Sequence, residues 1–143
     1  MPEIKNFIYC MGTKSDTRPG EERRVTSVEG IQNCLLPDYI PGNFSFSIVF
    51  SLLDLKPGEE YCVEVSFNHE NEEVARVEDI QLTGRIDNKY NVPENYFGYQ
   101  IAIDLRNVLL NEEGVYHTIV SLNGEEKGDY PIYVKAKQVS ENV

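Results

Sequence analysis

Alternation of apolar and polar residues is the strongest pattern along the chain, and it is clearest from Phe44 to Leu53. Every second residue from Phe44 to Leu52 is Phe, Ile or Leu, and serine occupies positions 45, 47 and 51 on the other side. Side chains point alternately to the two faces of a β-strand, so this period of two predicts a strand with one large apolar face. Because other segments must cover that face, the pattern predicts a soluble domain of packed β-layers.

Further segments share this alternation or are rich in β-branched and aromatic residues. They predict strands at residues 4–11, 61–67, 97–105, 116–122 and 130–134. Asn123-Gly124 follows the fourth of these segments, and both residues tolerate a positive φ, so they predict a tight hairpin turn. Pro57-Gly58 is a second short turn signal, and it predicts that the strands on either side are antiparallel neighbours.

Two segments carry mixed signals. Residues 25–36 have apolar residues at a helical spacing of three, but Gly30 in the middle weakens a helix and favours a bulged strand. Residues 74–82 would fit one face of a helix, but their place between strands favours a bulged hairpin partner for residues 61–67. We therefore predict strands at both. Turn-forming and polar residues predict loops at 12–24, 37–43 and 84–95.

These elements predict an all-β fold. The expected architecture is a single antiparallel β-sandwich of about seven to nine strands, for which Greek-key connections are one option. A chain of 143 residues is long enough for one domain with an ordinary hydrophobic core. We assign residues 1–136 to the sandwich and residues 137–143 to a flexible C-terminal tail.

The run Asn111-Glu112-Glu113-Gly114-Val115-Tyr116 resembles the tyrosine corner of immunoglobulin-like sandwiches, in which the Tyr hydroxyl returns to the upstream backbone. The chain has no Trp and no Cys pair at the antibody spacing, so the resemblance implies only the immunoglobulin-like architecture. Together with the segment Ile40-Pro-Gly-Asn-Phe44, the pattern also resembles small uncharacterised bacterial or phage-borne sandwich proteins. That resemblance implies no assigned activity.

Net charge and cysteine usage narrow the expected partners and location. The net charge is -11 and the pI is about 4.6, which argue against nucleic acid or an anionic membrane as the partner. The sequence shows neither a secretory signal pattern nor an apolar stretch of about 20 residues, so we expect a cytoplasmic protein. Its three cysteines lack zinc-site spacing and are expected to be free thiols, and we predict no cofactor.

Few residues in the sequence are candidates for catalysis or metal binding. A catalytic His69 or His117 would need a nucleophile or carboxylate within hydrogen-bond reach. His69 is expected in a turn among Glu70, Glu72 and Glu73, where a surface ion pair explains it, and His117 is expected to point away from the core. We therefore expect no enzyme. Calcium binding, as in C2-like sandwiches, needs converging Asp oxygens, and the aspartates at 54, 87 and 104 are isolated in sequence.

The best candidate for binding is the loop from Asn88 through Tyr99, which carries three tyrosines among its asparagines. Tyr supplies contact area at small entropic cost and Asn adapts its hydrogen bonds, as in known binding loops. The structural alternative is that Phe97 and Tyr99 belong to the core and the asparagines form turns. We predict a non-enzymatic protein-interaction or structural module that uses loops or an edge strand to contact a protein partner or a copy of itself. The alternative is a sandwich that binds a ligand or ion, such as a sugar or Ca²⁺. The predicted partner-binding residues are Asn88, Tyr90, Asn91, Asn95 and Tyr96.

Overall fold

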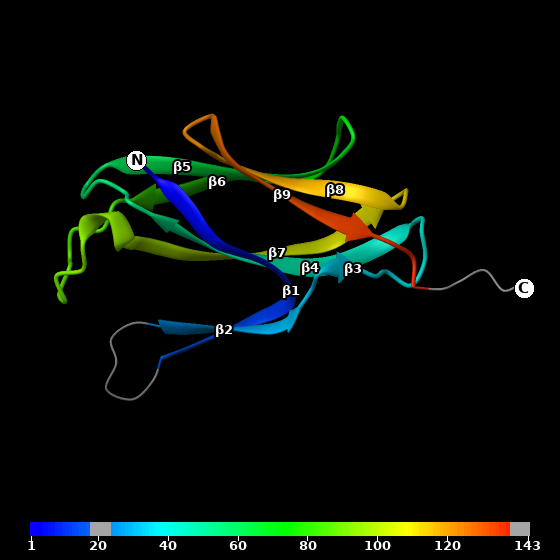
Figure 1. The fold of residues 1–143 in the computed structure, drawn as a ribbon, viewed down its shortest axis with the longest axis horizontal. Helices are drawn as coiled ribbons and strands as arrows, with labels where there is room; N and C mark the ends of the chain where they lie inside the picture. Colours follow the sequence, from blue (N-terminus) through cyan, green and yellow to red (C-terminus); the bar gives the residue numbers. More distant parts are fainter. Residues whose placement is uncertain (18–23, 138–143) are drawn as a thin grey trace, which may run out of the picture.

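Nine β-strands and one short 3-10 helix make up the described part of the chain, residues 1–17 and 24–137 of this computed structural model (Figure 1). They are β1 (Glu3–Thr17), β2 (Arg24–Ile31), β3 (Cys34–Leu35), β4 (Gly42–Leu53), β5 (Glu60–His69), β6 (Glu72–Thr83), η1 (Glu94–Tyr96), β7 (Gly98–Leu110), β8 (Gly114–Leu122) and β9 (Glu125–Val134). One sheet has the order β2-β1-β4-β7 and the other β3-β9-β8-β5-β6. The two sheets pack against each other, which confirms the predicted all-β sandwich.

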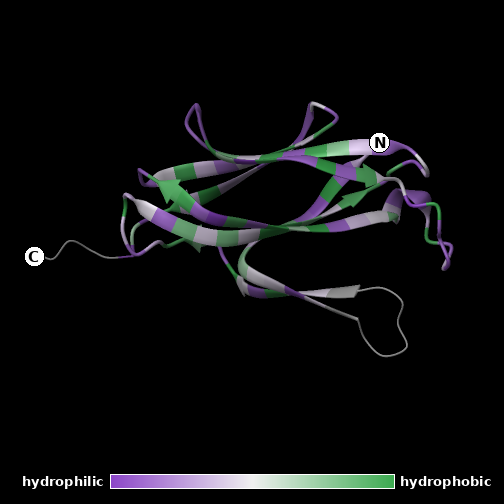
Figure 2. Cartoon of the chain, turned by 180° about the vertical axis from the view of Figure 1, so that it is seen from behind, coloured by the Kyte–Doolittle hydropathy of each residue, from purple (hydrophilic) through white to green (hydrophobic). Residues whose placement is uncertain are grey.

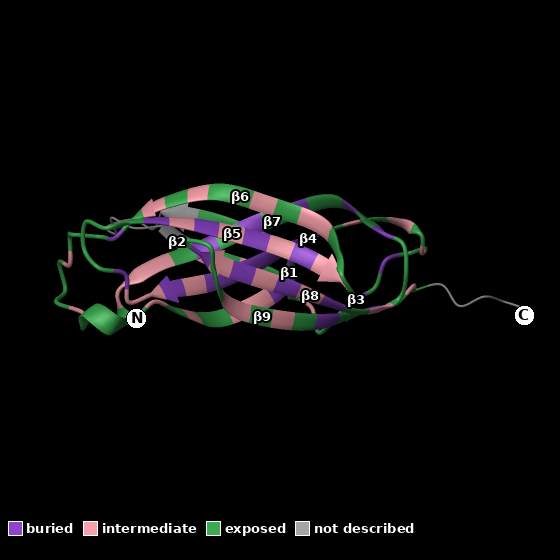
Figure 3. Cartoon of the chain, turned by 90° about the horizontal axis from the view of Figure 1, so that it is seen from above, coloured by how far each residue is buried: buried purple, intermediate pink, exposed green. Residues whose placement is uncertain are grey.

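The core lies between the two sheets, and the apolar face of β4 is at its centre. The inward side chains of this strand are at most 2% exposed: Phe46, Ile48, Phe50 and Leu52. The ring of Phe46 lies 5.1 Å from that of Phe67 in β5, which lies 5.2 Å from that of Tyr116 in β8. Figure 2 shows hydrophobic and hydrophilic residues alternating along the strands, and Figure 3 shows the same alternation of burial in β5. The predicted central strand is confirmed.

The outer face of β4 is partly buried as well, which the serines did not predict. Ser47 and Val49 are each 3% exposed, and the Ser47 hydroxyl donates to Asp104 Oδ1 at 2.6 Å. Cys10 pairs with Ser47 in register and is completely buried. All three cysteines are free thiols as predicted, and burial raises the pKa of the Cys10 thiol. This thiol is therefore shielded from solvent.

The prediction that Pro57-Gly58 joins neighbouring strands is wrong. It connects β4 in one sheet to β5 in the other, so the chain passes from one sheet to the other at this exposed turn. Both strands carry a large apolar face. Packing one strand over the other across the core buries both faces, whereas neighbours in one sheet would need other strands to cover them. The turn is fixed by two backbone hydrogen bonds between Gly58 or Glu59 and Gly84, at 2.9 and 2.8 Å.

The predicted loop at residues 12–24 is largely wrong where it can be compared. β1 continues to Thr17 and pairs with β2 from Cys10 onward, and residues 18–23 lie outside the described part. Figure 1 shows the β1–β2 ribbon projecting away from the sandwich. A projecting ribbon buries little on either face, so its sequence lacks the apolar alternation that marks the other strands.

The predicted bulged strand at residues 25–36 is two strands, β2 and β3, separated at Gln32-Asn33. Gly30 has a φ of 64°, as expected for a glycine that bends a strand. β3 pairs in parallel with β9, through Cys34 with Tyr133 and Leu35 with Val134. Among the described strands, this two-residue pairing is the only parallel one.

Other local predictions are confirmed. Residues 74–82 lie in β6, a bulged partner of β5, and the register shifts between Val63 and Val65. Asn123 and Gly124 have φ values of 52° and 82° and join β8 to β9. Residue 137 is the only part of the predicted tail within the described residues, and the Lys137 N–H donates to the Pro37 carbonyl at 2.7 Å. Across residues 1–17 and 24–137, no helix has the length and apolar character to cross a membrane.

Candidate functional site

Loop 84–97 connects β6 of one sheet to β7 of the other and carries all five predicted partner-binding residues. Asn88 fixes its middle. The Asn88 side chain donates to the Val92 carbonyl at 2.7 Å, and its Oδ1 accepts from the Val92 N–H at 2.9 Å. Asn91 adopts a φ of 54° and donates its N–H to the Asn88 carbonyl. These two asparagines therefore shape the loop.

The two ends of loop 84–97 are also held in place. The Arg85 guanidinium lies 5.6 Å from the ring centre of Phe97 and 5.4 Å from that of Tyr99, close enough for cation–π attraction. The Tyr99 hydroxyl donates to the Thr83 carbonyl at 2.6 Å. Gly84 is buried against the backbone of Lys56, where a Cβ would lie 1.9 Å from the carbonyl oxygen. The loop is thus attached to the sandwich at both ends.

Large side chains nevertheless project from this loop into solvent. Tyr90 is 79% exposed, Tyr96 is 60% exposed, and Ile86 is 79% exposed. Asn95 is exposed in η1 and lines an open hollow of about 750 Å³ together with Tyr61. Four of the five predicted residues are therefore exposed, and Asn88 is half-buried; Asn88 and Asn91 also hold the loop. Sequence reasoning missed Ile86, although an isolated isoleucine in a polar loop was a usable signal.

Loop 84–97 also differs from the rest of the chain in charge. Its two basic residues, Arg85 and Lys89, balance its two acidic residues, Asp87 and Glu94, whereas the whole chain has a net charge of -11. The Lys89 ammonium lies 5.8 Å from the ring centre of Tyr90. The exposed aromatic residues therefore belong to a segment that carries no net charge in an acidic protein.

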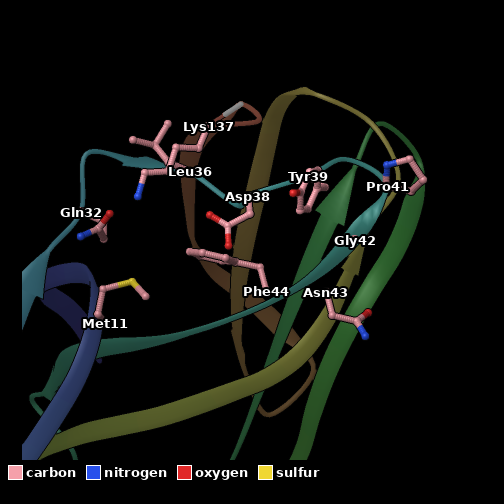
Figure 4. A pocket seen from close by; sticks show the side chains of 10 residues that line it. All are labelled: Met11, Gln32, Leu36, Asp38, Tyr39, Pro41, Gly42, Asn43, Phe44 and Lys137. Carbon is pink, nitrogen blue, oxygen red and sulfur yellow. The ribbon is translucent and has the colours of Figure 1, made fainter. Parts of the chain in front are cut away.

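A second surface is formed by β1, the start of β4, the segments on either side of β3 and Lys137 (Figure 4). We call it the Phe44 hollow; its volume is about 530 Å³, and it is lined by Met11, Gln32, Leu36, Asp38, Tyr39, Pro41, Gly42, Asn43, Phe44 and Lys137. Met11 and Leu36 are 46% exposed and Tyr39 is 64% exposed. The sequence predicted only a turn here, because the lining residues come from distant parts of the chain.

The tyrosine corner predicted from residues 111–116 forms the expected hydrogen bond. The Tyr116 hydroxyl donates to the Glu112 carbonyl at 2.7 Å, and burial raises the pKa of Tyr116.

His69 does not lie in the turn as predicted, but is the last residue of β5, and its ring stacks on Tyr116 with 4.3 Å between centres. His117 is half exposed, and its Nδ1 lies 2.7 Å from Asp129 Oδ1.

A comparison with protein families assigns this chain to one of them. The family model described as "Family of unknown function (DUF6941)" matches residues 21–135, which is most of the chain. The matched region includes loop 84–97, most of the Phe44 hollow and both histidines. A search of curated proteins found no matching sequence. The chain is therefore a member of the DUF6941 family, a family of unknown function whose matched region here is a β-sandwich.

Proposed function

We propose that the protein is a non-enzymatic interaction module that binds a protein partner through loop 84–97. The observation that carries this proposal is the exposure of Ile86, Tyr90 and Tyr96 on a loop whose backbone is held at its ends and in its middle. Exposed side chains of this size contribute little to folding. A loop that is already ordered loses less entropy when it binds, so these side chains offer contact area at low cost.

The net charge of the chain favours a different protein as the partner over a second copy of the chain. Two copies would each bring a net charge of -11, and like charges oppose association. The neutral loop allows close approach, and the acidic surface around it favours a partner with a basic rim. The proposed partner is therefore a different protein with an apolar patch surrounded by Lys and Arg.

The contacts of the two histidines support the non-enzymatic part of the proposal. His117 contacts Asp129, and His69 contacts Tyr116, the Val115 carbonyl and two glutamates. In both cases the ring is engaged by carboxylates, backbone or an aromatic ring. A nucleophile activated by either histidine would instead require a Ser, Thr or Cys side chain within hydrogen-bond distance.

The double substitution Tyr90→Ala/Tyr96→Ala tests the proposal. Exposed substitutions usually change stability by less than about 0.5 kcal/mol, so the melting temperature should stay nearly unchanged. Loss of two central aromatic contacts should weaken partner binding by about tenfold or more. Tyr133→Ala is the matched control, because Tyr133 is 46% exposed on β9, outside the loop.

The measurement compares captures from the native host by quantitative mass spectrometry, followed by titration of the purified partner. The proposal predicts one protein that the native chain and the Tyr133→Ala variant retain and the double variant loses. An unchanged set of captured proteins with the double variant contradicts it. If light scattering instead shows a dimer that depends on Tyr90 and Tyr96, the partner is a second copy of the chain.

The Phe44 hollow favours a second candidate function, the binding of a small ligand. Its volume of about 530 Å³ is within the usual range for ligand sites, and Tyr39 and Phe44 offer apolar surface for a ring such as that of a sugar. Asp38 and Lys137 lie at the same opening and could contact polar groups. A thermal-shift screen tests this, because a ligand of the native state raises the melting temperature. Tyr39→Ala should abolish the shift, and Tyr133→Ala should preserve it.

A further inference from the structure

Glu112, in the loop before β8, lies beside the consecutive residues His69 and Glu70, at the end of β5 and in the turn before β6. One ligand atom from each lies within 4.8 Å of the others. His69 Nε2 is 3.6 Å from Glu112 Oε1 and 3.9 Å from Glu70 Oε1. Both distances exceed an ordinary hydrogen bond. They are close to the ~3.4 Å that separates two ligands of a tetrahedral zinc ion with bonds of about 2.1 Å.

The other nitrogen of His69 fixes the state of the ring. Nδ1 lies 3.1 Å from the Val115 carbonyl oxygen, and a carbonyl can only accept a hydrogen bond. Nδ1 therefore carries the proton, which leaves a lone pair on Nε2 in the neutral imidazole. Metal-binding histidines almost always donate their second N–H to a carboxylate, a backbone carbonyl or water, as His69 does here. Val115 lies outside the cluster, so this contact is independent of the acidic residues.

Tyr116 and Gly114 hold the cluster in position. The His69 ring stacks on Tyr116 with 17° between the planes, and its side chain is only 12% exposed. The Tyr116 hydroxyl holds the backbone carbonyl of Glu112, so one residue positions two of the three groups. A Cβ at Gly114 would lie 3.1 Å from His69 Cε1, and the φ of 135° there also favours glycine.

We propose that His69, Glu70 and Glu112 bind a divalent transition-metal ion of the Zn²⁺ type. One imidazole nitrogen and two carboxylates suit zinc, and two negative charges balance a doubly positive ion. Three protein ligands leave a coordination position for water. Ca²⁺ takes six to eight oxygen ligands, so the imidazole makes it a poor match.

A bound ion would connect the β5–β6 turn to the β7–β8 loop. The site is distinct from loop 84–97, because that loop follows Thr83, which pairs with Glu60 at the start of β5, whereas His69 ends this strand. A strand of ten residues is about 30 Å long. The metal proposal therefore stands or fails independently of the proposed partner binding.

The test is a calorimetric titration of the full chain with Zn²⁺ in a Cys34→Ser/Cys62→Ser background, since the thiols of the exposed Cys34 and the half-buried Cys62 would bind zinc themselves. We expect one bound ion per chain and a rise in melting temperature. Glu70→Gln and Glu112→Gln should each lower the affinity about tenfold or more. Both side chains are largely exposed, at 77% and 66%, so these variants should fold, which circular dichroism without zinc verifies.

Two controls remove the same charge or the same ring elsewhere. Glu60→Gln changes an exposed glutamate at the start of β5, and His117→Gln removes a histidine that contacts a single carboxylate. Both control variants should bind Zn²⁺ as tightly as the background protein. In the background protein, added Zn²⁺ should shift the ¹⁵N resonance of His69 Nε2. The absence of binding at millimolar Zn²⁺, or equal affinity in all four variants, overturns the proposal.

Discussion

At the residue scale, Tyr9 joins the two sheets through its hydroxyl. It extends from β1, and the hydroxyl oxygen lies 2.6 Å from Thr118 Oγ1 and 2.5 Å from the Tyr130 carbonyl oxygen in the other sheet. Thr118 is completely buried. The sequence placed Tyr9 in a strand but gave no sign of this contact, because its partners are more than 100 positions away. Buried polar groups of this kind are costly to leave unpaired.

Replacing Tyr9 with Phe should therefore lower the free energy of unfolding. The hydroxyl of Thr118 and the carbonyl of Tyr130 lose a partner inside the protein, which typically costs about 1–3 kcal/mol. Chemical denaturation of the native protein and the Tyr9→Phe variant measures the difference. Tyr133→Phe, on the exposed face of β9, should have almost no effect. Equal stability of all three proteins would show that the Tyr9 contact contributes nothing.

Burial raises the pKa values of Tyr9, Tyr116 and Tyr130 in the folded protein. Unfolded tyrosines ionise near pH 10, so above that pH the unfolded chain holds fewer protons than the folded one. The stabilisation is therefore complete below about pH 10 and is lost as the pH rises further. Urea unfolding at several pH values should show this decline, with a shallower slope for Tyr9→Phe. An identical slope in both proteins contradicts the assignment for Tyr9.

At the element scale, most strands and the pairings β5–β6 and β8–β9 were predictable from the sequence, but the arrangement of β4 and β5 was not. Alternation is a local signal, so β4, β5, β7 and β8 could be located from their own residues. Whether β4 and β5 are neighbours or face each other depends on which faces must cover one another, and a short turn at Pro57-Gly58 serves both arrangements. The Phe44 hollow was unpredictable for a similar reason, because Met11, Tyr39 and Lys137 meet only after folding.

The functional residues show the same limit within loop 84–97. An asparagine that contacts a partner and one that fixes a turn look alike in sequence. Asn88 and Asn91 prove to hold the loop, whereas Tyr90 and Tyr96 are exposed as a contact residue requires. The sequence located the candidate surface, and the structure shows which of its residues hold the loop backbone and which have exposed aromatic rings.

Gly84 should be essential for the junction between this loop and the β4–β5 turn. An added Cβ would lie 1.9 Å from the Lys56 carbonyl oxygen, so the backbone must shift in Gly84→Ala. We expect a loss of about 1–3 kcal/mol of unfolding free energy, measured by chemical denaturation. Gly12→Ala is the matched control, because no atom lies within 4 Å of its added Cβ. A Gly84→Ala variant as stable as Gly12→Ala would show that the junction tolerates the shift.

At the scale of the whole molecule, the candidate surfaces lie at two ends of the sandwich. In the pairing of β4 with β7, Leu53 lies opposite Gly98, next to loop 84–97, and Gly42 lies opposite Leu110, next to the Phe44 hollow. The His69 cluster also belongs to the second end, since Glu112 follows Leu110 closely. Between the two ends, the buried faces of the two sheets form one packed hydrophobic core. The three candidate sites are therefore divided between the two ends of one scaffold.

Site-specific photo-crosslinking in the native host tests the central claim most directly. A photoreactive phenylalanine analogue would replace Tyr90, Tyr96 or, as the control, Tyr133. If loop 84–97 contacts a protein partner, positions 90 and 96 should each form a covalent adduct with the same protein, and position 133 should form none. Adducts from position 133 together with none from the loop positions would contradict the proposed function.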